Sequence, residues 1–299
     1  MKQRRISRWL EPLRETTGVS RWMFWSGVAI VAFFVVLAVF APILAPYGFD
    51  QVSDAGVRFP KQGSPDGTHL FGTTVGNYDV LSRVIWGART AIEVVLLAVV
   101  FSLAIGVPLG LFSGYVGGRA DRVLVLIMDA LFAFPYILLA IVIAFLLSDK
   151  LGQGVVTAAV AITAVYVPQY FRVVRNHVIS VREEPYVEAA VSAGTPALKR
   201  LYRHILPNTV APLIVQGTYI CAFAMLLEAI LSFLGVGLPP EIPTWGNIMA
   251  EGRLQFNEYP HSVLFPGLFL AFTVLSVNML GDGLRDTLDP HFGKRGDRP

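Results

Sequence analysis

The sequence predicts an all-α, polytopic membrane protein with six transmembrane helices. Of its 299 residues, 54% are hydrophobic and 15% are charged, whereas roughly 25% of an average soluble domain is charged. The apolar residues gather in six long blocks, and the basic residues gather in alternate segments between those blocks. A soluble globule of this composition would expose large apolar patches and aggregate, so we exclude that class.

The six apolar blocks are each long enough to cross a bilayer. A helix rises about 1.5 Å per residue, so a hydrocarbon core of roughly 30 Å needs about 20 apolar residues. The blocks that meet this criterion lie near residues 23–44, 91–112, 123–147, 155–171, 210–234 and 263–280. The first is too long for the apolar region of a signal peptide, about 7–15 residues, and no convincing cleavage site follows it. We therefore expect it to be retained as a membrane anchor.

The basic residues predict the orientation of the chain, because Lys and Arg concentrate in cytoplasmic loops. With the N-terminus inside, 18 of the 24 Lys and Arg residues fall in the inner segments 1–21, 114–122, 172–208 and 281–299. Both termini are therefore predicted to be cytoplasmic. The same bias accounts for the net charge of +3, so that charge is no argument for a nucleic-acid partner, and we expect none.

The predicted organisation has five parts. These are a cytoplasmic tail 1–22, a first transmembrane helix 23–44, a periplasmic or extracellular loop 45–90, a five-helix core 91–280 that includes an inner loop 172–208, and a cytoplasmic tail 281–299. The single cysteine, Cys221, lies within an apolar block, which excludes a disulfide inside the chain.

The inner loop is predicted to contain two short helices. Pro185 suits the first turn of one helix, and Gly194 suits a cap at its C-terminal end. At helical spacing, Ala189, Ala190 and Ala193 give this helix a surface of small side chains. Such a surface allows the backbone of another protein to approach closely, which makes the loop a candidate docking element.

The second helix of the inner loop is predicted to begin with Thr195 as its cap and Pro196 at its first position. We expect it to end before Pro207. A plainer interpretation of both helices is a solvated hairpin that only connects two spans, and the residues alone leave this alternative open.

The inner loop resembles a motif of a known family. Glu188-Ala189-Ala190, followed by Gly194 and then Leu206-Pro207, resembles the EAA loop of permease subunits in bacterial ABC importers. Residues 203–208 are similar to the form in the dipeptide, oligopeptide and nickel branch, although His204 stands where Ile is common. In that family the loop sits on a separate ATPase subunit and transmits the movement driven by ATP binding. The resemblance therefore assigns ATPase coupling to Glu188, Ala189, Ala190, Gly194, Leu206 and Pro207.

The resemblance covers nearly the whole chain. Segments 71–89, 228–253 and 278–290 are similar to further signatures of the family, in order and at its spacing. Segment 71–89 departs from the usual form, with Thr74 in place of an Asp and Asn77-Tyr78-Asp79 in place of a Gly-Arg-Asp triplet. The resemblance is to the C-type permease of a pair and implies the permease fold of a type I ABC importer.

This resemblance implies a function and a set of partners. The chain would form half of a translocation path for dipeptides, oligopeptides or a related solute such as nickel, in a bacterial plasma (inner) membrane. The implied partners are a B-type permease subunit in a heterodimer, one or two cytoplasmic ATPase subunits, a periplasmic or lipid-anchored solute-binding protein, and membrane lipids. ATP would be hydrolysed by the ATPase partner, and no cofactor is expected on this chain. The identity of the solute is not encoded in any feature of this sequence.

Other classes of function are less consistent with the residues. The five histidines fall in loops or at the ends of spans, so no catalytic or metal-binding set is predicted from His69, His177, His204, His261 and His291. Gly293-Lys294 lacks the rest of a phosphate-binding loop, so we expect no ATPase site and no enzyme activity. The alternative is an ion-gradient-driven secondary transporter, which typically shows inverted repeats. We find no such repeat, and a secondary transporter would leave the docking loop without a function.

Some polar residues and prolines interrupt the predicted spans. Glu228 lies deepest, where a charge costs at least about 2.5–3.5 kcal/mol. It either lines the translocation path or makes a structural hydrogen bond to a neighbouring helix, and both interpretations remain open. Glu93 and Asp129 are close enough to span ends to reach the membrane interface. Kinks can arise where prolines remove backbone hydrogen bonds, at Pro108, Pro135 and Pro168.

Overall fold

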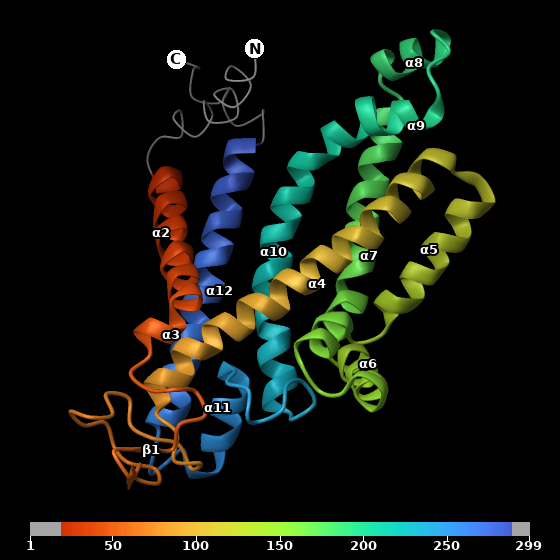
Figure 1. Ribbon diagram of the computed structural model, residues 1–299. Helices are drawn as coiled ribbons and strands as arrows, with labels where there is room; N and C mark the ends of the chain where they lie inside the picture. Colours follow the sequence, from red (N-terminus) through yellow and green to blue (C-terminus); the bar gives the residue numbers. More distant parts are fainter. Residues whose placement is uncertain (1–18, 289–299) are drawn as a thin grey trace.

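The computed structural model describes residues 19–288, which form long helices joined by short segments (Figure 1). The elements in chain order are α2 (Val19–Val39), α3 (Ala41–Leu44), β1 (Ser53–Asp54), β2 (Val57–Arg58), α4 (Val80–Val116), α5 (Gly118–Ala133), α6 (Tyr136–Leu151), α7 (Val155–Arg182), α8 (Pro185–Ser192), α9 (Ala197–Arg200), the π-helix η1 (Leu201–Ile205), α10 (Leu206–Phe233), α11 (Trp245–Gly252), the 3-10 helix η2 (Arg253–Gln255) and α12 (His261–Leu288). Strands β1 and β2 pair as a small antiparallel hairpin.

The two ends of the helix bundle differ in what they carry. At one end lie the β hairpin and α11, within what we call the cap, residues 45–79 and 234–260 (Figure 1). At the opposite end lie α8 and α9, together with the start of α2 and the last described turn of α12. From here on, the inner loop is residues 183–205. The long helix α4 runs diagonally between the two ends.

Among residues 19–288, five helices are long and apolar enough to cross a membrane, and a sixth span exists if α5 and α6 are counted as one bent pair. The span predicted over 123–147 corresponds to this pair, and the kink predicted at Pro135 is a sharp break, because α5 and α6 meet at an angle of 96°. The break falls at Phe134, which has extended backbone angles, and Pro135, which precedes α6. Proline disfavours helical geometry in the residue before it and lacks an N–H to continue the helix. Pro108 and Pro168 instead lie inside α4 and α7.

Helix α4 begins at Val80, so the loop predicted for 45–90 ends at Asp79 instead. Asp79 is the N-terminal cap: its Oδ2 accepts hydrogen bonds from the backbone N–H and the hydroxyl of Ser82, at 2.8 and 2.7 Å. The hydropathy of the segment gives no sign of this start, because the first turns of α4 carry polar side chains. The predicted cytoplasmic tails 1–22 and 281–299 lie partly within helices, because α2 includes residues 19–22 and α12 includes residues 281–288; residues 1–18 and 289–299 lie outside the described residues.

A row of three glycines brings α4 against α7. A Cβ atom at Gly106 would lie 2.8 Å from the Tyr170 side chain, and at Gly110 and Gly114 it would lie 2.7 and 2.8 Å from α7 carbonyl oxygens. Small residues four apart allow this close approach of two membrane helices. The close packing fixes the relative position of the two helices that support the inner loop.

Candidate functional site

The first helix of the inner loop forms where it was predicted, as α8. Gly194 follows its end with φ of +71°, in the left-handed region. The N–H of Gly194 donates to the carbonyl of Val191 at 2.9 Å, and the N–H of Thr195 donates to that of Ala190 at 3.0 Å. This pair of bonds is the Schellman arrangement, which satisfies the last carbonyls of a helix. The predicted C-terminal cap at Gly194 is confirmed.

The second helix of the inner loop differs from the prediction. Pro196, not Thr195, is the cap residue of α9, and the Thr195 carbonyl accepts a hydrogen bond from the Arg200 side chain instead. The helix does not end before Pro207, because α9 continues through η1 into α10. Pro207 lies in the first turn of α10 and has no N–H to continue the hydrogen-bond ladder, and Leu206 just before it donates to the Leu201 carbonyl, five residues back. The π-helix takes up the change in hydrogen-bond register around it.

The inner loop is tied to α4 and α7 on its buried side. Ile205 is fully buried and packs in a cluster with Val174 and Val178 of α7. The Nε atom of Arg200 donates a hydrogen bond to the hydroxyl of Tyr115, the penultimate residue of α4, at 2.8 Å. Any force on the inner loop therefore reaches the ends of two membrane helices. Neither Arg200 nor Tyr115 is predicted as a site residue by the sequence, because 85 positions separate them.

The inner loop also leaves several large apolar side chains exposed within the described chain. Leu198 is 69% exposed, and the other large apolar side chains there are also exposed, namely Tyr186, Val191 and Tyr202. We call these four residues the loop patch. The sequence could have identified the loop patch from these large apolar residues, which interrupt an otherwise polar loop. The six predicted coupling residues are also mostly at the surface: Glu188, Ala189, Gly194 and Pro207 are exposed, and Ala190 and Leu206 are partly buried.

The six predicted residues do not form one surface. Glu188 to Gly194 share α8 and its cap, whereas Leu206 and Pro207 lie in the first turn of α10. Leu206 packs against the cluster beneath the loop, around Ile205. It therefore supports the loop from below, while the residues of α8 present its outer face.

Glu228, the deepest charged residue predicted in a span, is almost completely buried in α10. The hydroxyl of Ser232 donates a hydrogen bond to its Oε1 at 2.8 Å, and its Oε2 has no hydrogen-bond partner among the described residues. The partner is one turn along the same helix, so the expected bond to a neighbouring helix is wrong. A role in lining the path stays a prediction. The shallower carboxylates pair with arginines, Glu93 with Arg89 at 3.0 Å and Asp129 with Arg172 at 2.7 Å.

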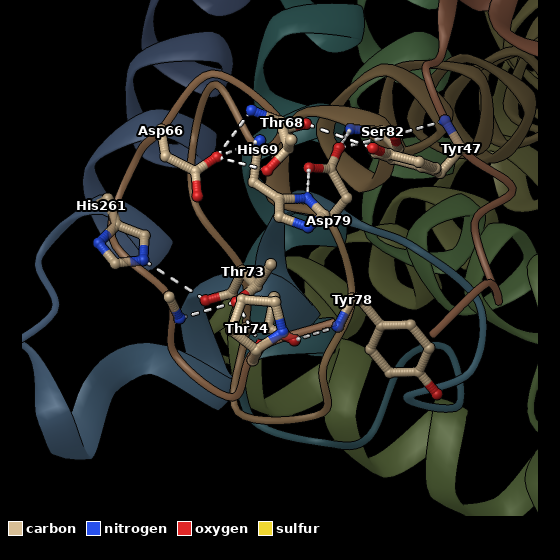
Figure 2. Close-up of polar contacts among 12 residues, drawn as sticks. Tyr47, Asp66, Thr68, His69, Thr73, Thr74, Tyr78, Asp79, Ser82 and His261 are labelled. Carbon is tan, nitrogen blue, oxygen red and sulfur yellow. Dashed lines mark hydrogen bonds and ion pairs between the residues drawn. The ribbon is translucent and has the colours of Figure 1, made fainter. Parts of the chain in front are cut away.

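The cap is held to the start of α4 by a buried polar network (Figure 2). His69 Nδ1 and Asp79 Oδ1 are 2.9 Å apart, and both side chains are buried. The backbone N–H of Tyr47 donates to the Ser82 hydroxyl at 3.0 Å, which attaches the chain just after α3. Nearby, the side chain of Asp66 accepts hydrogen bonds from the backbone and hydroxyl of Thr68 and from the backbone of His69, which lowers the pKa of Asp66.

The residues that depart from the family signature have a structural explanation. Asn77 stands where Gly is usual and has φ of +63°, a conformation that Asn adopts more readily than most residues. Its side-chain amide donates to the Phe59 carbonyl at 2.7 Å. Tyr78 stands where Arg is usual, and the guanidinium of Arg83 lies 4.4 Å from the centre of its ring. The substitutions therefore preserve the turn that precedes α4.

Arg83 joins α4 to the second part of the cap. Its guanidinium is buried and its Nη2 donates to the Pro240 carbonyl at 2.6 Å, with Glu251 of α11 at 4.0 Å. Burial raises the pKa of Glu251, and the positive charge of Arg83 opposes that effect. Trp245, at the start of α11, donates from its indole N–H to the Val84 carbonyl at 3.0 Å. One helix, α4, thus contacts the cap at one end and the inner loop at the other.

The histidines do not assemble a site. His69 belongs to the cap network, and His261 lies 3.4 Å from the Thr73 carbonyl. Across residues 19–288 there is no group of three or more His, Cys, Asp or Glu side chains that could hold a metal ion. His291 and Gly293-Lys294 lie outside the described residues.

The fold and the inner loop define the membrane-spanning subunit of a transport system, and comparison with known proteins agrees. Residues 106–294 match the family described as "Binding-protein-dependent transport system inner membrane component", and residues 19–60 match the "N-terminal TM domain of oligopeptide transport permease C". The first match covers more than half of the chain. The chain belongs to this family of permease components, and its N-terminal match is to the C-type permease.

Several named relatives cover most of the chain. It is 39% identical to the dipeptide transport system permease protein DppC of Alkalihalophilus pseudofirmus, over 88% of this chain and 84% of that protein. It is 37% identical to the glutathione transport system permease protein GsiD of Escherichia coli, over 90% of this chain and 86% of that protein. It is a transport subunit of the ATP-binding-cassette class and not an enzyme.

A solved structure shows the same fold. Inward-facing conformations of the MetNI methionine ABC transporter contain a chain that superposes with a TM-score of 0.56, at 18% identity, over 69% of this chain and 96% of that one. The predicted fold class, an all-helical permease of a type I importer, is confirmed.

Proposed function

We propose that this protein forms half of the translocation path of an importer for short peptides in a bacterial plasma membrane. The relatives that cover most of the chain are named for dipeptide, peptide and glutathione transport. The second half of the path would come from a B-type permease, and solute would arrive from a binding protein, periplasmic or lipid-anchored, at the cap.

The inner loop faces the cytoplasm in this proposal. Its basic residues, and the other basic segments of the sequence, support that orientation through the bias of Lys and Arg toward the cytoplasm. The start of α2 and the last described turn of α12 share the end that carries α8 (Figure 1), which is consistent with both termini being cytoplasmic.

The observation that carries the proposal is the inner loop, which is anchored on one side and uncovered on the other. The loop patch and the small side chains of α8 would sit on an ATPase subunit, which binds and hydrolyses ATP. Closure of the ATPase pair would move α8, and the Arg200–Tyr115 hydrogen bond would pass the motion to α4. Because α4 also reaches the cap through Arg83, the same motion would open the path outward.

The experiment that tests coupling is the substitution Gly194→Leu. Gly194 has φ of +71° and no atom within 4 Å of an added Cβ, so a side chain there strains the backbone at the end of α8 without a clash. We expect co-purification of the ATPase and peptide uptake to fall at least about tenfold, since a misplaced α8 loses its docking geometry.

The matched control is Gly152→Leu. Gly152 ends α6 with φ of +74° and ψ of 166° and is equally open. This conformation is essentially restricted to glycine, so the substitution strains the backbone at least as much, away from the inner loop. We expect ATPase association to stay at the wild-type level in this variant. Normal association and uptake in Gly194→Leu would refute the coupling role.

A further inference from the structure

The break between α5 and α6 opens a cavity of about 490 Å³. Residues 131–136, which surround the break, form one wall, and residues of α7 and α10 form the other. Its principal side chains are Phe132, Phe134, Tyr136, Tyr166, Gln169 and Phe223. A volume of this size lies within the range of small-molecule sites, roughly 300–1,000 Å³. Glu228 is not among the residues that line it.

A break in a membrane-spanning helix leaves backbone N–H and C=O groups without their helical partners, which is costly in a bilayer. Backbone that leaves helical geometry within a membrane is tolerated where protein covers it or where it lines a cavity that water enters. Phe134 has extended backbone angles beside the cavity and is 61% exposed. The wall is nevertheless fixed, because Arg172 of α7 is 2.7 Å from Asp129 and its guanidinium lies 4.1 Å from the centre of the Phe132 ring.

The cavity combines aromatic walls with a few polar groups. Phe132, Tyr136 and Phe223 are all about half exposed, so their rings are available for contact. Gln169 Oε1 accepts a hydrogen bond from Gln216 Nε2 at 3.3 Å. The Gln169 amide nitrogen and the Tyr166 hydroxyl have no hydrogen bond within the described chain, which leaves both free to bind a ligand. Apolar walls with convergent polar groups are the usual composition of a small-molecule site.

We propose that this cavity is a contact site for the transported peptide, which rests on the function proposed above. A large apolar or aromatic side chain of the peptide lies against Phe223 and Tyr136, and a peptide carbonyl accepts hydrogen bonds from Gln169 and Tyr166. The broken span is then the part of this subunit that distinguishes solutes by side-chain size.

The first test reduces the cavity volume with Phe223→Trp. The complete importer, with both permeases, the ATPases and the binding protein, is reconstituted in proteoliposomes, and uptake of alanyl-phenylalanine and glycyl-glycine is measured. We expect the ratio of the two uptake rates to fall at least about fivefold, because overpacking rejects the large side chain first. The control is Phe112→Trp, a half-exposed position on α4 outside the cavity, for which the ratio stays at the wild-type value.

The second test removes the free amide with Gln169→Leu. Uptake of both peptides should fall about tenfold, the effect of losing one hydrogen bond to a buried ligand. ATPase co-purification should stay unchanged, and Gln169→Asn should recover part of the uptake. A third test uses Tyr136→Cys in a Cys221→Ala background, where alanyl-phenylalanine should slow labelling by a water-soluble thiol reagent.

The outcomes separate this inference from the proposed function. If the wild-type importer carries no dipeptide, both the proposed function and the peptide assignment of the cavity are wrong. If it carries dipeptides while Phe223→Trp leaves the uptake ratio unchanged, only the cavity assignment is wrong. If the Tyr136→Cys importer is unreactive toward the thiol reagent with and without peptide, the second permease fills the cavity and the inference is also overturned.

Discussion

The cap and the inner loop stand at opposite ends of the same helix, α4, and satisfy their polar groups differently. In the cap, buried side chains bond to distant parts of the chain: Trp245 donates to the Val84 carbonyl, and the Pro240 carbonyl accepts from Arg83. In the inner loop, hydrogen bonds stay mostly local and large apolar side chains face outward. The difference teaches that contacts between distant residues of this chain fix the cap, whereas the inner loop is built mainly from local hydrogen bonds. Both regions leave large apolar side chains exposed, Leu254 in the cap and Leu198 in the inner loop.

The largest effect on stability is expected where the cap meets α4. Asp79→Ala removes the N-terminal cap of α4 and leaves His69 buried without its partner. Loss of an N-terminal cap costs about 0.5–2 kcal/mol and an unsatisfied buried polar group costs about 1–3 kcal/mol, so we expect a clearly lowered melting temperature for the detergent-purified permease pair. Asp79→Asn keeps a capping oxygen and should lose clearly less. Equal melting temperatures for Asp79→Ala and the wild type would show that the cap does not depend on this network.

An intermediate effect is expected where the inner loop meets α4. Tyr115→Phe removes the hydroxyl that accepts from Arg200 and should cost about 1 kcal/mol of stability, the net value of a typical hydrogen bond. Uptake should fall more than this stability loss implies, while ATPase still co-purifies, because the hydrogen bond transmits motion. The comparison variant is Tyr259→Phe, which removes a hydroxyl in the cap, away from the inner loop. Normal coupling of ATP hydrolysis to uptake in Tyr115→Phe would remove this bond from the mechanism.

The smallest effect on stability is expected on the loop patch. Leu198→Ser replaces an apolar side chain that is 69% exposed, so the stability of the permease pair should stay within the range of surface substitutions, about ±0.5 kcal/mol. Association with the ATPase should weaken about tenfold, as expected when an apolar side chain is removed from an interface. The measurement is a titration of ATPase onto the purified permease pair. A large loss of stability with unchanged ATPase association would contradict the assignment of the loop patch as a docking surface.

Local composition predicts most of the membrane topology and one part of the site. The span 263–280 lies within α12, the span 210–234 lies within α10 except for residue 234, and α8 ends before the Gly194 cap as expected. At Pro135 the sequence indicates only a kink, because proline chemistry predicts a disruption but not its angle. The start of α4 escapes prediction because Asp79 acts as a cap only once the chain around it has folded.

The sequence by itself determined that this chain crosses a membrane, that its inner loop forms a capped helix, and that it belongs with importer permeases. These properties depend on apolar length, charge bias and residues close together in the chain, so they need no distant contact. Only the tertiary structure decided which side of the inner loop is free. It also decided that Arg200 attaches the inner loop to α4, that Arg83 attaches α4 to the cap, and that the broken span encloses a cavity. Those features join residues far apart in sequence, and such pairs are set by how helices pack.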